Sequence, residues 1–445
     1  MDSLFTILSF LVAITVLVGF HELGHFFAAR FFGVKVLTFS IGFGRSIWSI
    51  GDGVDKTKFS LGAIPLGGYV RMLDESDNPS CDEIDGTFSY KPAWQKALIA
   101  LAGPIANFIL TFVLFAFVFG ANNMSLKPVL GEPQTDSLFY SAGLKGGETL
   151  VRINDRRVDS WSDLRWEMTR FDSDRLNIEV AGRDSINMTL HSFNVGDRSA
   201  SLFWTNIGLE MPKVDLNPVI GLIDPSGTAS ESDLLVGDRI VSVDQLAIST
   251  WNQFVEVIRA QPGESVDLTV ERDKQLSELS LTIGMVDGSV GQIGVAPDPS
   301  GIMQEDLVDR DGLSVLQAMT KSLQRTGDLI GFTTRMIVGL IAGDVGLDNL
   351  AGPLVIADQA GKTAEMGLVT FLSFLAILSV SLGVINLFPL PMLDGGHIVF
   401  HLYELILGKR MPERVIVTAQ QIGMVCLVGL MVFVIANDFL RYLGN

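Results

Sequence analysis

Two histidines and a glutamate form the sequence HELGH inside a long apolar segment near the start of the chain. His21 and His25 lie four residues apart, so on an α-helix both imidazoles share one face and can bind one tetrahedral Zn²⁺. Glu22 lies beside such a metal without binding it. Because zinc lowers the pKa of a bound water to about 7, Glu22 can take a proton from that water and generate a nucleophile at neutral pH. The spacing therefore predicts metalloprotease chemistry.

The apolar surroundings of this motif argue against a chance match. Residues 4–32 are almost uninterrupted in their apolar character and are long enough to span a bilayer. A charged side chain in such a helix costs roughly a few kcal/mol, so ionisable residues are rare there and usually functional. No Lys or Arg precedes the segment, which predicts a retained helix and not a cleaved signal peptide. The candidate zinc ligands are thus predicted to lie within a membrane.

A second polar motif, NLFPLPMLDGGH, stands near the end of another apolar segment. Pro389 and Pro391 each lack an amide donor and break the helix, leaving backbone groups that are tolerated at membrane depth only inside protein or beside a wet cavity. Asp394 follows as a candidate third zinc ligand. Asn386, about two turns earlier, can donate its amide to a substrate carbonyl or a developing oxyanion. Two histidines, one carboxylate and an open position for water are typical of catalytic zinc.

Other histidines leave an alternative open. His397 and His401 form a second pair four residues apart, with Glu404 one turn further on, so a second or alternative metal site has to be weighed. Support of the first site or packing at a helix start is the favoured interpretation, because a ligand set from these residues would leave Asp394 and the proline break unexplained. His191 lies in a strand-like segment and is expected to be exposed.

Length and composition indicate a membrane protein with additional soluble domains. The chain has 445 residues, of which 48% are hydrophobic. Segments of spanning length are residues 4–32, 97–120, 368–390 and 415–436. The formal charge of −18 argues against nucleic acid as a partner. Cys81 and Cys426 are the only cysteines, and no disulfide is expected between them.

The distribution of cations predicts the orientation. Lysines and arginines concentrate between the first and second spans and between the third and fourth, so both connections should be cytoplasmic. The termini and the acidic central region then face outward. HELGH and Asp394 each come late in a span that runs from outside to inside, so they should meet in the cytoplasmic leaflet.

The central region contains a repeat. Residues 142–164 and 232–254 align without gaps, each reading as a glycine turn, a short strand, a polar turn and an amphipathic helix. The run LLVGDRIVSVDQ resembles PDZ domains, which implies a groove that binds a peptide or substrate ectodomain by strand addition. The first copy has Gly-Gly-Glu where Gly-Asp is usual, which favours a gate over a binder. A spacer role for the whole repeat is the alternative.

Two further segments flank these elements. FSIGFGRSIWSI and KFSLGAIPLGGYVRM alternate like the strands of a β-hairpin, which we expect to dip into the membrane and pair with an unwound substrate, or else to form a plain cytoplasmic hairpin. Residues 314–341 are amphipathic and are predicted to lie at the outer interface, in contact with lipid. The glycine-rich stretch that follows is predicted to be a loop leading to the third span.

The combination of HELGH, AGPIAN (residues 102–107), NLFPLPMLDGGH and the repeat resembles the site-2 protease family of intramembrane zinc metalloproteases over nearly the whole chain. The resemblance implies a bacterial inner-membrane protease that cleaves a single-span anti-sigma factor after a first periplasmic cut, in a stress response, with remnant signal peptides as a second substrate class. It assigns Zn²⁺ to His21, His25 and Asp394, the general base to Glu22, and substrate or oxyanion support to Asn386. Candidates for support of the site or for substrate binding are Asn107, Pro389, Pro391, His397, Gly67 and Gly68.

The predicted fold is a polytopic α-helical membrane protein with four transmembrane helices, a membrane-associated β-hairpin and two tandem PDZ-like α+β domains. The predicted divisions are transmembrane helices at 1–33, 97–121, 368–396 and 415–445, the hairpin region at 34–96, PDZ-like domains at 122–212 and 213–300, an interfacial helix and loop at 301–367, and a cytoplasmic connection at 397–414. The PDZ-like domains and both termini would be periplasmic. Rival interpretations are a membrane-anchored PDZ scaffold with a non-catalytic zinc site and a zinc or proton transporter, the latter disfavoured because the ionisable residues cluster at one depth.

Overall fold

The computed structural model describes residues 3–51, 57–77, 81–121, 125–170, 175–189, 204, 206–212, 215–225, 227–286, 290–298, 307–309, 312–346 and 350–444. These residues form two compact units. We call the unit that contains described residues 3–121 and 312–444 the helical unit, and the unit that contains described residues 125–309 the β-rich unit. His191, which the sequence predicts to be exposed, lies outside the described residues.

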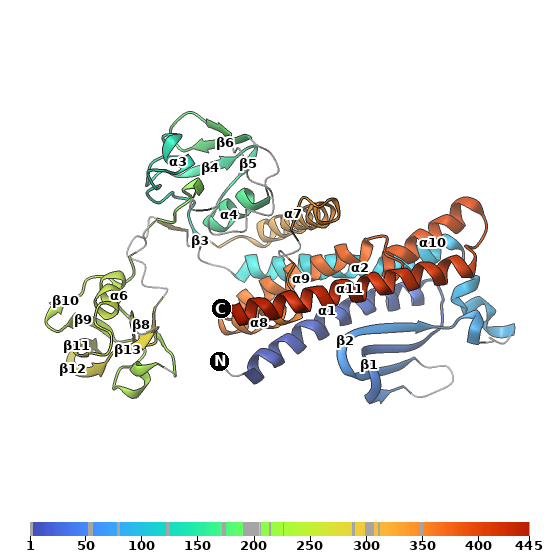
Figure 1. Ribbon diagram of the computed structural model, residues 1–445, viewed down its shortest axis with the longest axis horizontal. Coiled ribbons are helices and arrows are strands. Elements are labelled where there is room, and N and C mark those ends of the chain that lie inside the picture. The colour runs from blue at the N-terminus through green and yellow to red at the C-terminus, as the bar shows by residue number, and fades with distance from the viewer. Residues whose placement is uncertain are drawn as a thin grey trace. The chain divides into compact units, whose positions relative to one another are not determined.

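The helical unit contains the helices that can cross a membrane (Figure 1). Its helices are α1 (Ser3–Phe31), α2 (Ala93–Ala121), α7 (Val315–Ala342), α8 (Pro353–Glu365), α9 (Leu368–Leu387), α10 (Asp394–Leu407) and α11 (Glu413–Gly444). Among the described helices, four have the length and composition of a span: Leu4–Phe31, Ala93–Ala121, Leu368–Leu387 and Glu413–Phe439. Each predicted span thus corresponds to a helix that is long and apolar enough to cross a membrane, and the third of these helices ends at Leu387, earlier than the sequence suggested.

Helix α2 is the centre of the helical unit, packing against α1, α7, α9 and α10. Apolar side chains from α1, α2 and α9 meet in a core built around Leu17, Leu110 and Leu375. Hydroxyl groups also link α2 to its neighbours: Thr111 Oγ1 on α2 donates to the carbonyl of Ala376 on α9 at 3.2 Å, and Ser322 Oγ on α7 donates to the carbonyl of Phe112 on α2 at 2.5 Å. Such bonds hold helices together where lipid supplies no partner for a polar group.

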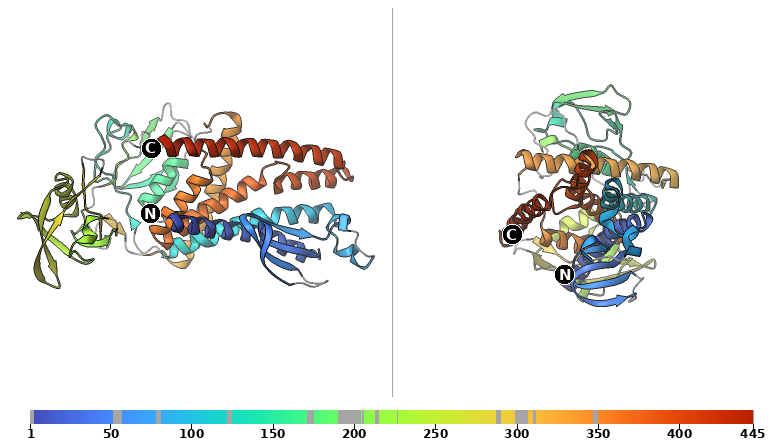
Figure 2. Two further views of the ribbon diagram at one scale, coloured as in Figure 1. Left: turned by 60° about the horizontal axis from the view of Figure 1, so that its bottom comes forward. Right: turned by 90° about the vertical axis from the view of Figure 1, so that its right-hand side faces the viewer.

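A two-stranded antiparallel sheet, β1 (Val36–Ile50) and β2 (Lys58–Met72), lies beside α1 (Figure 2). The strands that the sequence predicts are thus present. Buried residues occur only in the first half of β1, and residues 43–50 are exposed. Gly42 and Gly44 have φ of 89° and 83°, where the register is irregular and a side chain would strain the backbone. Short 3₁₀ helices at Glu75–Asp77, Cys81–Gly86 and Phe88–Tyr90 then lead to α2.

The β-rich unit contains two four-stranded sheets with matching strand order, β5-β4-β6-β7 and β10-β9-β11-β12. The first comprises β4 (Leu150–Ile153), β5 (Arg156–Arg157), β6 (Arg175–Val180) and β7 (Ile186–Thr189), and the second β9 (Arg239–Val243), β10 (Leu246–Ala247), β11 (Ser265–Arg272) and β12 (Gln275–Thr282). Helices α3 (Leu138–Ser141), α4 (Trp161–Arg170) and α6 (Trp251–Arg259) and the 3₁₀ helix Thr228–Glu231 accompany them. Smaller pairs join β3 (Ser125–Leu126) to β16 (Val308–Asp309), β8 (Ile220–Ile223) to β15 (Val295–Pro297), and β13 (Gly284–Val286) to β14 (Val290–Gln292).

The repeat in the sequence is visible in these two sheets. Gly147 and Gly237 both have positive φ, 84° and 96°, immediately before the first long strand of each sheet. Trp161 and Trp251 each begin the helix that follows. Each Trp is nearly buried, at 4% and 7% exposure, and anchors its helix to the core of its own half. Equivalent residues of the two copies thus perform the same structural task.

One prediction was wrong. The glycine-rich stretch before the third span contains helix α8, not only a loop. Pro353 stands in the first turn, where its missing amide donor is harmless. Asp438 on α11 accepts hydrogen bonds from the backbone amides of Gly352 at 3.0 Å and Leu354 at 3.1 Å. A carboxylate far along the chain therefore caps the helix, and local sequence alone does not reveal such a partner.

Candidate active site

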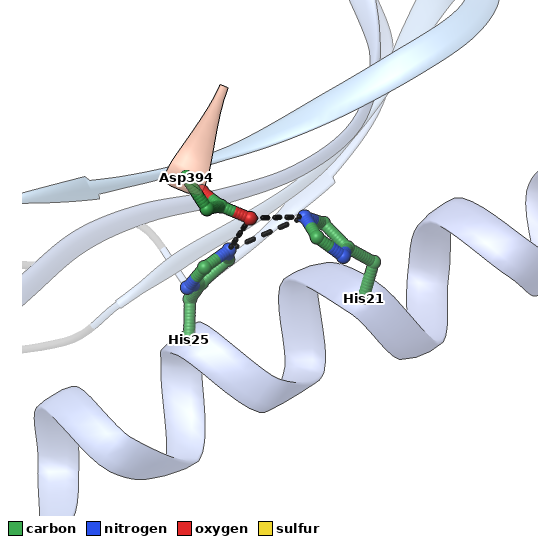
Figure 3. Close-up of side chains that lie close together, drawn as sticks. All are labelled: His21, His25 and Asp394. Carbon is green, nitrogen blue, oxygen red and sulfur yellow. Dashed lines mark hydrogen bonds and ion pairs between the residues drawn. The ribbon is translucent and has the colours of Figure 1, made fainter. Parts of the chain in front are cut away.

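The residues of the HELGH motif occupy the second half of α1 and point one face of that helix toward the start of α10. His21, Glu22 and His25 are buried, with exposures of 8%, 8% and 9%. Asp394 is the first residue of α10 and extends toward both imidazoles (Figure 3). Its Oδ2 lies 3.1 Å from His21 Nε2 and 3.3 Å from His25 Nε2. The two Nε2 atoms are themselves 3.3 Å apart.

These three distances fit a tetrahedral metal site. Ligand atoms that each lie 2.0 to 2.1 Å from Zn²⁺ are separated from one another by roughly 3.3 Å. Among the described residues, these three form the one group of histidines and carboxylates whose ligand atoms lie close enough together to share an ion. Oδ2 of Asp394 is buried and has no conventional hydrogen-bond donor among those residues, so its negative charge faces only the two ring nitrogens. The donor set therefore suits a divalent cation with a free coordination position.

Close packing of α1 on α2 makes this geometry possible. A Cβ at Gly103 would lie 2.3 Å from Nε2 of His25, and a Cβ at Gly24 would lie 2.2 Å from the carbonyl oxygen of Ala102. Any larger residue at either position would push the helices apart or displace a ligand. Sequence reasoning missed both roles, although small residues in AGPIAN and HELGH are the usual signal for close helix contact in membranes.

Each histidine also has a partner on its second ring nitrogen. His25 Nδ1 donates to the backbone carbonyl of Ile99 at 2.8 Å. His21 Nδ1 lies 3.2 Å from Nδ2 of Asn107, which is fully buried on α2. Hydrogen bonds of this kind fix the ring orientation of metal-binding histidines. The structure thus brings the predicted residue Asn107 into the site, and it adds the carbonyl of Ile99, which the sequence does not reveal.

Asn386 and the hairpin approach from other directions. Nδ2 of Asn386, on the last turn of α9, lies 3.4 Å from Nε2 of His21, next to the position of the ligand atoms. Gly68 on β2 lies beside the base candidate, because a Cβ there would come within 2.9 Å of Glu22 Cγ. At Gly67, where φ is 113°, a Cβ would lie 2.3 Å from the ring of Phe43. Gly68 therefore lets β2 run directly past Glu22, and Gly67 leaves room for Phe43.

The proline segment turns the chain between α9 and α10. Its tightness requires glycine after Asp394, because a Cβ at Gly395 would lie 2.1 Å from the carbonyl oxygen of Phe388 and one at Gly396 would lie 2.3 Å from that of Leu390. Pro389 and Pro391 occupy the turn between these contacts. The predicted helix break is thus observed, and its consequence is that Asp394 begins α10 in position to face α1.

The alternative metal site at His397, His401 and Glu404 is not supported by the described residues. Glu404 Oε2 instead pairs with the buried ammonium of Lys96 at 2.7 Å. Burial, and then the neighbouring Lys96 charge, lowers the pKa of His401 to about 4, so this ring is neutral at physiological pH. His397 and His401 line a cavity of about 190 Å³ beside this ion pair. A lysine from α2 thus pairs with the glutamate that such a metal site would use, and residue spacing could not reveal this.

Comparison with known proteins identifies the family. The model of peptidase family M50 matches residues 9–430. The chain belongs to this family. Regulator of sigma-E protease RseP of Escherichia coli (strain K12) is 36% identical over 459 residues, covering 99% of this chain and 100% of that protein. A regulator of sigma E protease of Haemophilus influenzae is 33% identical over 452 residues, with 99% and 100% covered.

Two further similarities complete the comparison. A Vibrio cholerae protein that carries the provisional name zinc metalloprotease is 34% identical over 452 residues, with 99% of both chains covered. The PDZ domain of an SdrC-like protein from Listeria monocytogenes is 15% identical, with a TM-score of 0.17, and covers 20% of this chain and 93% of its own.

The predicted resemblance to the site-2 protease family is confirmed by these matches, which include RseP of Escherichia coli. The chain is therefore an intramembrane metalloprotease, and its apolar helices together with these relatives indicate a protein of the inner membrane. The scaffold and transporter interpretations are correspondingly set aside.

Proposed function

We propose that this chain is an intramembrane zinc endopeptidase in which His21, His25 and Asp394 hold the metal and Glu22 is the general base. The observation that carries the proposal is the spacing of 3.1 to 3.3 Å among the three ligand atoms, two of them on a spanning helix. Zinc bound there would supply a Lewis acid that activates water and polarises the scissile carbonyl. The described residues offer three protein ligands, which leaves a position free for catalysis, as in other catalytic zinc sites.

The surrounding residues can then transfer the proton, stabilise the oxyanion and bind the substrate. Glu22 accepts a proton from the attacking water and later passes it to the leaving amine. Asn386, whose amide lies next to His21, donates to the carbonyl oxygen as negative charge develops on it. The backbone of β2 runs beside Glu22 at Gly68, and this part of the strand, with Gly67, can hold an extended substrate by strand addition. An unwound peptide is needed because a helix engages its own carbonyls.

The substrate class follows from the membrane placement of the site. We infer that single-span membrane proteins are cut within the bilayer near its cytoplasmic side, with the PDZ-like domains at 122–212 and 213–300 and both termini in the periplasm. The cation distribution supports this orientation. Relatives named regulator of sigma-E protease support a substrate in the sigma-E pathway, and we propose an anti-sigma factor that is cleaved after a first periplasmic cut. Remnant signal peptides are a second proposed class, and the PDZ-like domains would bind or exclude substrate ectodomains.

The decisive experiment uses purified full-length protein and a tagged single-span substrate that lacks its outer domain. Wild type and Glu22→Gln should both hold about one zinc per chain, and only the wild type should cut, because removing a general base lowers the rate by about 10²- to 10⁴-fold. Glu365→Gln, which changes an exposed carboxylate at the end of α8, is the matched control and should cut normally. Equal cleavage by wild type and Glu22→Gln would refute the assignment of the base.

A further inference from the structure

The two histidines of the site receive different kinds of support on Nδ1. The partner of His25 is the carbonyl of Ile99, which can only accept a hydrogen bond, so Nδ1 of His25 must carry a proton. The partner of His21 is the side-chain amide of Asn107, which can present either a donor or an acceptor. Oδ1 of Asn107 is buried and has no hydrogen-bond partner among the described residues. The ring of His21 is therefore the one whose proton position depends on a side chain.

Metal binding makes a specific demand on that ring. A neutral imidazole that binds zinc through Nε2 must carry its proton on Nδ1, which is then a donor. With Nδ2 of Asn107 facing Nδ1 at 3.2 Å, the two donors would oppose each other. Rotation of the amide by half a turn exchanges its oxygen and nitrogen at nearly the same positions. That rotation would give Oδ1 the partner that it lacks and match the proton of His21.

The backbone of Asn107 is held firmly enough to direct its side chain. Its carbonyl accepts hydrogen bonds from Thr111 Oγ1 at 2.9 Å and from Ser379 Oγ at 2.8 Å. The first bond comes from the next turn of α2 and the second from α9, so two helices fix the position of the residue. Asn107 is fully buried, so a polar atom of its amide that lacks a partner is costly.

We infer that Asn107 is a positioning residue that accepts a hydrogen bond from Nδ1 of His21 when zinc is bound, and thereby keeps Nε2 of His21 free for the metal. The contact that the side chain of Asn107 makes with the proposed ligands is the one with Nδ1 of His21. It acts through His21 alone. The inference rests on the proposed zinc site. It predicts that zinc affinity depends on the oxygen of the Asn107 amide and not on its nitrogen.

Two substitutions separate the acceptor from the donor. Asn107→Leu has a similar volume and no acceptor, and it should weaken zinc binding by about 10- to 100-fold, the usual effect of removing a hydrogen-bond partner of a metal-binding histidine. Asn107→Asp keeps the acceptor and removes the amide donors, and it should bind zinc within about threefold of wild type or more tightly. Ser322→Ala is the control. It removes a buried hydroxyl that donates to the backbone of α2, and it should leave zinc affinity unchanged.

Zinc affinity is measured on the full-length protein by competition with a chelator, and thermal unfolding of each variant is recorded in parallel. Equal zinc affinity of Asn107→Leu and wild type would overturn the inference and leave the zinc site intact. If Asn107→Leu and Asn107→Asp lost zinc affinity equally, the amide donors or the packing would be responsible, and the inference would also be overturned. Wild type that binds no zinc would refute the proposed metal site itself. If Asn107→Leu fails to fold, Asn107→Asp still tests the inference. This variant keeps the acceptor and lacks the amide donors, so retained zinc affinity supports the acceptor role and lost zinc affinity overturns it.

Discussion

The helical unit and the β-rich unit each bury an oxygen of a carboxylate, and they use it in different ways. Asp238 in the β-rich unit is 1% exposed and is satisfied by the fold: Arg272 donates two hydrogen bonds to it, each at 2.7 Å, and the amide of Leu235 donates a third at 2.8 Å. Oδ2 of Asp394 in the helical unit faces two ring nitrogens and no conventional donor. A carboxylate that meets a cation in the fold stabilises the structure, whereas one that faces two imidazole nitrogens is available to bind a metal ion.

The largest expected effect tests the chemical half of this comparison. Asp394→Ala should lose bound zinc and reduce cleavage below detection, because two histidines alone hold the metal weakly. Its thermal unfolding in zinc-free buffer should match that of the wild type, since the fold gives this carboxylate no cation. Zinc content and cleavage are measured on the same preparation. Normal zinc content would contradict the assignment of Asp394 as a ligand.

A smaller loss of cleavage rate is expected for a residue that donates a hydrogen bond to the substrate and does not bind the metal. Asn386→Ala should retain zinc and cut about 10²- to 10³-fold more slowly, the usual effect of removing one oxyanion donor. Single-turnover kinetics with a saturating substrate separate this loss from weaker binding. If the variant instead lost its zinc, Asn386 would belong among the groups that hold the metal site together.

Lys96 tests whether the helical unit also contains a structural charge pair. Its side chain is 5% exposed and lies 2.7 Å from Glu404, which is 19% exposed. Lys96→Met leaves that carboxylate without its main partner, so the free energy of unfolding should fall by about 3 kcal/mol. The double variant with Glu404→Gln should recover much of the loss, because it removes the uncompensated charge. Denaturant unfolding of the full-length protein measures both, and a double variant no better than Lys96→Met would refute the pairing.

The smallest expected effect lies in the β-rich unit and depends on pH. Burial opposes ionisation of Asp238, but the hydrogen bonds from Arg272 and Leu235 prevail and lower its pKa in the folded protein. The pair therefore stabilises the fold above the unfolded pKa of about 4, and this contribution is lost as the pH falls through the lower folded pKa. Arg272→Met should lower the unfolding temperature at pH 7, and the difference from wild type should shrink progressively in acid.

A matched control for this variant exists in the other copy of the repeat. Glu148 accepts from the amide of Lys145 and pairs with Arg183, as Asp238 does with Leu235 and Arg272, but Glu148 is 20% exposed. Arg183→Met should therefore change the unfolding temperature less than Arg272→Met, as expected for a partly solvated pair. Calorimetry of both variants at pH 7 and in acid makes the comparison. A larger change in unfolding temperature for Arg183→Met than for Arg272→Met would contradict this prediction.

Much of this site could be predicted from the sequence because its chemistry is carried by short motifs. HELGH fixes two ligand candidates and the base by helical spacing, and the proline break marks Asp394. The remaining features depend on which helix lies opposite. Ile99 offers only its backbone, Gly24 and Gly103 matter through contacts with other helices, and Lys96 meets a glutamate on α10. Such pairings are set by tertiary packing, and periodicity along one segment does not reveal them.

The hydrogen bond from His25 to the carbonyl of Ile99 has a consequence for how this protein can vary. Every amino acid supplies the same carbonyl, so the chemical support of His25 places no demand on the side chain at position 99. A search for residues that change together would therefore not connect positions 25 and 99, although the ring of one rests on the other. His21 differs, because its neighbour at position 107 is a side chain that substitution can remove. Half of the support for the metal site is thus protected from mutation by being part of the main chain.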